Sequence, residues 1–128
     1  MNTMPDETRQ LYEAASRDKM SFDLLFETGR APNETMGFLA QQTCEKCIKA
    51  ILVLHGISID RTHDLERLYE IAVTGAIKIP ASVDALRQLN PYAVSFRYEA
   101  SDVEWMSEEE IRTLIDSMYE WATAKIGK

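Results

Sequence analysis

Apolar side chains recur every three or four residues along nearly the whole chain, which is the spacing of one face of an α-helix. No stretch shows the sustained alternation of apolar and polar residues that marks a half-buried strand. The segments between the periodic stretches are short, and short loops place consecutive helices antiparallel. The sequence therefore predicts an all-α fold, an up-and-down antiparallel helical bundle of four main helices plus a short extra helix.

Capping residues and glycines mark the expected helix ends. The expected starts are Asn33, Thr62 or Asp64, Ser82 and Ser107, and the expected stops are Gly29, Gly56 and Gly75. The first helix is expected over residues 6–28, and the second is expected to be central because apolar residues crowd it. Ser107 stands three residues before Glu110, the spacing of a capping box, which predicts the start of the last helix.

Length and composition are those of one globular domain spanning residues 1–128, with 45% hydrophobic and 27% charged residues. The longest apolar run is too short to span a bilayer, so no membrane association is expected. The first residues lack the basic and apolar parts of a signal peptide, and a cytoplasmic location follows as the expectation. A net charge of −7 opposes nonspecific adhesion to nucleic acid. A nucleic-acid partner is therefore possible but not favoured.

The two cysteines, Cys44 and Cys47, form one C-x-x-C inside a helical repeat. A zinc tetrahedron needs further Cys or His ligands at suitable spacing, and the sequence supplies none. Both thiols are expected to act as small core residues. We therefore expect no metal site and no cofactor.

Gln42, Glu45 and Lys49 are separated by three and four residues, which stacks them as a polar stripe on the second helix. The amide, carboxylate and ammonium of these side chains suit binding of a ligand with a base and a phosphate. The alternative is a solvated face in which Glu45 and Lys49 form a surface pair worth only about 0.3–0.5 kcal/mol.

Two further groups of polar residues are candidates for the same site. Arg61, His63 and Asp64 surround the expected start of the third helix, where free backbone N–H groups favour an anion. The alternative for them is capping by Thr62 or Asp64, with His63 folded onto the neighbouring helix. Arg97 and Tyr98 follow further aromatic residues, and a guanidinium beside rings suits a nucleobase.

Several of these residues, in this order, resemble the motifs of the HEPN domain family. They are Gln42, the run from Glu45 to Ala50, Gly56-Ile57, Thr62-His63-Asp64-Leu65, Leu89-Asn90-Pro91-Tyr92 and Arg97-Tyr98. The resemblance implies a helical bundle, usually a homodimer, that is named for proposed nucleotide binding and is often encoded beside a small nucleotidyltransferase. One departure is Glu99, where proline usually follows the Arg-Tyr pair.

Many members of that family are ribonuclease toxins that carry Arg, four to six residues, and then His. The only histidines here are His55 and His63, and neither has an arginine at the required distance before it. The resemblance therefore points to a nonribonuclease, nucleotide-binding-like branch acting with a nucleotidyltransferase partner. The alternatives are a ribonuclease toxin of a toxin–antitoxin pair with a nonstandard site built from His63, Arg97 and Tyr98, and a noncatalytic protein-interaction module.

Overall fold

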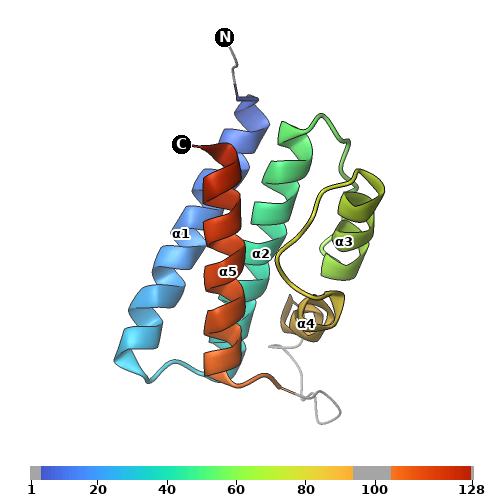
Figure 1. The fold of residues 1–128 in the computed structure, drawn as a ribbon. Helices are drawn as coiled ribbons and strands as arrows, with labels where there is room; N and C mark the ends of the chain where they lie inside the picture. The colour runs from blue at the N-terminus through green and yellow to red at the C-terminus, as the bar shows by residue number, and fades with distance from the viewer. Residues whose placement is uncertain (1–3, 94–104, 128) are drawn as a thin grey trace.

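The computed structural model describes residues 4–93 and 105–127, and these form the expected helical bundle (Figure 1). Its elements are α1 (Asp6–Thr28), α2 (Asn33–Leu54), α3 (Leu65–Thr74), α4 (Val83–Leu89), the 3₁₀-helix η1 (Asn90–Ala93) and α5 (Glu108–Ile126). No strand occurs in the described ranges. The all-α prediction is confirmed, with α4 as the short extra helix.

Helix α2 is the centre of the bundle, as its apolar content predicts. It packs against α1 and α5 on one side and against α3, α4 and η1 on the other. Figure 1 shows α1, α2 and α5 side by side, with α4 seen nearly along its axis. Cys44, Cys47, Ile48 and Ile51 of α2 have no exposed surface, so this helix supplies much of the core.

Most of the helix ends lie where the capping residues predict them. Helix α1 ends at Gly29, whose φ of 67° is left-handed and therefore favours glycine. Asp64 caps α3, Ser82 caps α4, and Ser107 with Glu110 forms the capping box of α5. The sequence left Thr62 and Asp64 open as caps of the third helix, and the structure selects Asp64.

Asn33 is an exception, because it is the first residue of α2 and Pro32 occupies the N-cap position. Its side chain is engaged elsewhere: Nδ2 donates to the carbonyl oxygen of Met106 over 2.9 Å, and Oδ1 accepts from the Tyr92 hydroxyl over 2.7 Å. The Tyr92 hydroxyl also accepts from the Met106 N–H over 3.0 Å. The prediction of Asn33 as a cap is wrong because this amide joins α2 to η1 and to the start of α5.

Charged side chains connect the helices where the core reaches its edge. Asp18 of α1 lies within the apolar stripe of its helix, and its Oδ2 accepts from Lys46 Nζ of α2 over 2.6 Å. His55 follows α2, and its Nδ1 lies 3.0 Å from the carbonyl oxygen of Ile51.

Within the described ranges, no helix is long and apolar enough to cross a membrane.

Candidate functional site

The carboxylate of Glu45 is the centre of a buried polar cluster on α2. Its side chain is only 5% exposed, although it carries a formal charge. Oε2 accepts from Lys49 Nζ over 2.9 Å and lies 2.9 Å from His63 Nδ1, while Oε1 accepts from Gln41 Nε2 over 3.2 Å. A buried carboxylate is stable only when its lone pairs are met in this way.

Glu45 and Lys49 therefore form the pair expected from their four-residue spacing, but not on a solvated face. The side chain of Lys49 is 12% exposed, so both partners are largely withdrawn from water. The alternative of an exposed surface pair is wrong, because Glu45 lies at the junction of α2 with the segment that precedes α3. An ion pair in this setting is screened much less than one in solvent.

Gln41 is a member of the cluster that the sequence analysis did not select. Its side chain is fully buried, and Nε2 donates both to Glu45 and, over 3.0 Å, to the carbonyl oxygen of His63. Gln42 is one step removed, since its Nε2 donates to Gln41 Oε1 over 2.7 Å. Gln41 stands four residues before Glu45, and this spacing was the available signal.

His63 is oriented by the buried carboxylate while its ring faces solvent. The carboxylate can only accept, so Nδ1 carries the proton in this contact. The side chain is 75% exposed, and Nε2 has no hydrogen-bond partner among residues 4–93 and 105–127. Fixing the Nδ1–H tautomer leaves Nε2 available as an acceptor, or as a donor once the imidazole is protonated.

Asp64 and Asn90 cap the start of α3 together. Asp64 Oδ1 accepts from the Glu66 N–H over 2.9 Å and from Asn90 Nδ2 over 2.7 Å. Asn90 Oδ1 in turn accepts from the Leu65 N–H over 2.9 Å. Two of the first amides of α3 are thus already bonded, as the capping alternative expects, and His63 is held beside them.

Three predicted site residues remain: Arg61, Arg97 and Tyr98. Arg61 is exposed and has no ion pair within the described part of the chain. Arg97 and Tyr98 lie outside the described residues.

The cysteine pair lies inside the core and is separate from this cluster. Both thiols have no exposed surface. Burial raises the pKa of Cys47 to about 12 and raises that of Cys44 well above its usual value. Reaction requires the thiolate, so both side chains are chemically inert in the folded protein.

Comparison with known proteins decides the family. The profile of the HEPN domain matches residues 8–123, which is most of the chain. This chain belongs to the HEPN family. The resemblance found in the motifs from Gln42 to Tyr98 is thereby confirmed. A search of the curated proteins found no significant match.

A solved HEPN structure has the same fold. The crystal structure of ST0689, an archaeal HEPN homologue, superposes with a TM-score of 0.60 at 22% sequence identity. The match covers 93% of this chain and 97% of the archaeal one. Identity at this level establishes the shared HEPN fold and nothing about ligand or activity.

Proposed function

We propose that this HEPN domain binds a nucleotide or a related phosphorylated ligand at the Glu45 cluster. The observation that carries the proposal is the shared carboxylate oxygen, Oε2, which lies 2.9 Å from both Lys49 Nζ and His63 Nδ1. One buried acceptor thereby holds an ammonium and an imidazole next to each other before any ligand arrives. Preorganised donors reduce the ordering cost of binding.

The roles of the other residues follow from their positions. An ammonium has three N–H donors and Glu45 takes one, so Lys49 keeps two for a phosphate. Arg61 is exposed near His63 in the sequence and supplies a second cation, and Gln42 reaches the cluster through Gln41. Asp64 positions His63 by capping α3. Arg97 and Tyr98 would complete the site from the segment after η1.

The proposal includes two partners, a second copy of the chain and a small nucleotidyltransferase. A homodimer would give each site a neighbouring chain, and a nucleotidyltransferase would supply or use the nucleotide. Light scattering of the purified protein tests the first partner. Coexpression with an adjacent nucleotidyltransferase gene, followed by copurification, tests the second.

A thermal-shift and calorimetry panel with mono-, di- and triphosphate nucleotides tests ligand binding. We expect at least one nucleotide to raise the melting temperature, and Lys49→Ala and Arg97→Ala each to abolish the rise. Lys46→Ala is the matched control: it removes the same charge from the same helix, but Lys46 bonds Asp18 and not Glu45. The ligand proposal fails if no nucleotide stabilises the protein, alone or with its partner, or if Lys46→Ala removes the shift equally.

One observation favours a second candidate, cleavage of RNA. The contact between Glu45 and His63 Nδ1 fixes the tautomer whose exposed Nε2 can accept a proton, which is the arrangement of a general base. In this candidate His63 would remove the proton from a 2′-hydroxyl, and the 2′-oxygen would attack the adjacent phosphorus. The bond from phosphorus to the 5′-oxygen would break, and the departing oxygen would take a proton from water. Arg97 and Tyr98 would stabilise charge on the phosphate.

Expression without neighbouring genes separates the two candidates. The ribonuclease candidate predicts growth arrest that His63→Ala abolishes and Glu45→Gln weakens. His55→Ala is the control, because it removes an imidazole at the end of α2 whose Nδ1 lies 3.0 Å from the carbonyl oxygen of Ile51 and not from Glu45. Normal growth on expression of the unaltered protein, or arrest that persists in His63→Ala, would eliminate this candidate.

A further inference from the structure

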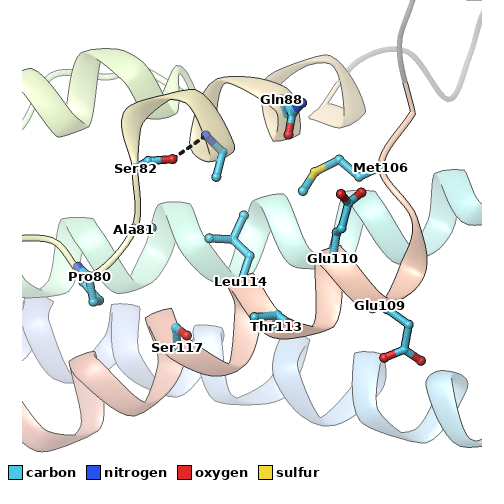
Figure 2. A pocket seen from close by; sticks show the side chains of 11 residues that line it. Pro80, Ala81, Ser82, Gln88, Met106, Glu109, Glu110, Thr113, Leu114 and Ser117 are labelled. Atoms are coloured by element: carbon cyan, nitrogen blue, oxygen red, sulfur yellow. Dashed lines mark hydrogen bonds between the residues drawn. The ribbon is translucent and has the colours of Figure 1, made fainter.

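A groove runs between α4 and α5 (Figure 2). In Figure 1, α1 and α4 lie on opposite sides of α5. Helices α4 and α5 both pack on α2, which leaves a space between them of about 440 Å³. Ligand-binding cavities have volumes of roughly 300–1,000 Å³, so the space is large enough to hold several side chains. It shares no lining residue with the Glu45 cluster.

The walls of this α4–α5 groove are mainly apolar. Leu114 and Met106 are 7% and 6% exposed and form the α5 side, while Ala81 and Ala85 line the opposite side. In Figure 2 the Leu114 and Met106 side chains project from the α5 side toward α4. Such a surface takes up apolar side chains, because contact with them removes both from water.

One end of the groove carries three consecutive carboxylates. Glu108, Glu109 and Glu110 form the first turn of α5, and no cation pairs with any of them within the described residues. Glu110 uses Oε1 to accept from the Ser107 N–H over 3.0 Å, and among residues 4–93 and 105–127 no donor bonds its Oε2. Figure 2 shows the Glu110 carboxylate on the groove side near Met106, whereas Glu109 points away from α4.

We propose that the α4–α5 groove is a docking site for a partner protein, and that its occupant is a short apolar segment carrying an arginine or lysine. Apolar side chains of the segment would lie against Leu114 and Met106, and the cation would reach Oε2 of Glu110. The proposal rests on the apolar lining and this charge complementarity together. It does not depend on the nucleotide site.

Blocked tripeptides that differ in one feature at a time test the proposal. The probe acetyl-Leu-Arg-Leu-amide has both features, acetyl-Leu-Glu-Leu-amide reverses the charge, and acetyl-Gly-Arg-Gly-amide lacks the apolar groups. Titrations are followed by the methyl NMR signals of Met106 and Leu114. We expect saturable shifts with the first probe at millimolar concentration and at least threefold weaker binding of the other two.

Two substitutions with a matched control locate the binding. Glu110→Gln keeps the capping box, since glutamine also serves there, and should weaken the first probe two- to fivefold. Thr113→Trp, at an exposed lining position, should fill the groove and abolish the shifts. Glu109→Gln, one residue away, should change the affinity less than twofold.

The docking proposal is overturned by any of three results. These are an absence of saturable shifts at Met106 and Leu114, equal binding of the charge-reversed probe, and equal weakening by Glu109→Gln and Glu110→Gln. Nucleotide thermal shifts on the same samples report on the other site. Failure of one proposal can therefore be told from failure of the other.

Discussion

At the scale of single residues, the position of Glu45 controls the local electrostatics. The side chain is 5% exposed and has Lys49, His63 and Gln41 around it. Removing the charge while keeping the shape would leave the ammonium of Lys49 without a counter-charge in a place that is only 12% exposed. A buried charge without a partner is costly.

Glu45→Gln is therefore expected to lower the free energy of unfolding by about 2–4 kcal/mol, measured by urea denaturation. Glu13→Gln, an exposed carboxylate on α1 without an ion pair in the described residues, should change it by less than about 0.5 kcal/mol. Equal effects of the two substitutions would mean that the Glu45 cluster adds no stability of its own.

The buried thiols predict a pH dependence of stability. The pKa of Cys47 is raised to about 12 by burial, whereas an unfolded thiol titrates near ~8.5. Below the unfolded value both states hold the proton, and as pH rises above it only the unfolded chain ionises. The free energy of unfolding should therefore fall, by on the order of 1 kcal/mol per pH unit for Cys47 between about pH 8.5 and 12. Cys44, whose pKa is also raised by burial, should add to this decline.

Urea denaturation at several pH values checks this dependence. The comparison is with Cys44→Ala/Cys47→Ala, which loses the thiols but keeps the tyrosines that also titrate in this range. The double variant should be less stable at neutral pH and show a smaller decline above it. The same slope in both proteins would contradict the expectation.

The sequence indicated which polar residues of α2 matter, but not how each is used. Residue spacing placed Glu45 and Lys49 together, because helix geometry is local. It missed Gln41, whose role depends on the carbonyl oxygen of His63 arriving from another segment. The four-residue spacing of Gln41 before Glu45 was a local signal, but spacing within one helix carries no information about an acceptor from another segment.

At the scale of elements, Gly37 lets η1 lie directly on α2. A Cβ built at this position would overlap the ring of Tyr92, which is 1% exposed. Glycine weakens a helix interior by roughly 0.5–1 kcal/mol relative to alanine, so its presence here is explained by the close approach of the ring. The Tyr92 ring also lies 4.7 Å from that of Trp105, measured between centroids.

Gly37→Ala should lower the free energy of unfolding by about 1–3 kcal/mol, because the ring or the helix must shift. In a Tyr92→Leu background the same substitution should be neutral or stabilising by up to about 1 kcal/mol, since alanine favours the helix. A double-mutant cycle on thermal or urea unfolding measures this coupling. Additive effects would show that the close approach does not constrain α2.

Helix starts were predictable wherever the capping side chain bonds a backbone amide close to it in the sequence. Asp64, Ser82 and Ser107 act through amides two or three residues away, so their patterns are local. Asn33 has the right residue type at the right place, yet its amide bonds Tyr92 and Met106, which are distant in the sequence. Long-range partners of this kind override a local preference and cannot be read from spacing.

At the scale of the whole molecule, one core joins the helices. Buried residues from α1, α2, α3, α4, η1 and α5 form a single cluster with α2 in the middle. A domain whose helices share one core is expected to unfold cooperatively. Sequence patterns alone predict the bundle because every long helix has a clear apolar face, whereas no local pattern marks the α4–α5 groove.

Urea unfolding should show one transition, with coincident far-UV circular dichroism and tryptophan fluorescence curves. Trp105 contacts η1 through Tyr92, and Trp121 lies on α5, so the two fluorophores report on different parts of the bundle. Trp105→Phe leaves Trp121 as the fluorescent reporter, and the fluorescence and circular dichroism curves should still coincide. Separate midpoints would indicate that α3, α4 and η1 unfold independently of the other helices.

The hydrogen bonds among Asn33, Tyr92 and Met106 hold together the two ends of the segment that carries Arg97 and Tyr98. They fasten residues 92 and 106 to the same end of α2, so we expect the spacing of these two anchor points to be kept when the residues between them are changed. A different peptide could be grafted there, such as an epitope tag or a related protein's version bearing other side chains in place of Arg97 and Tyr98. We expect such a graft to change the side chains offered at that position while the helices remain as they are.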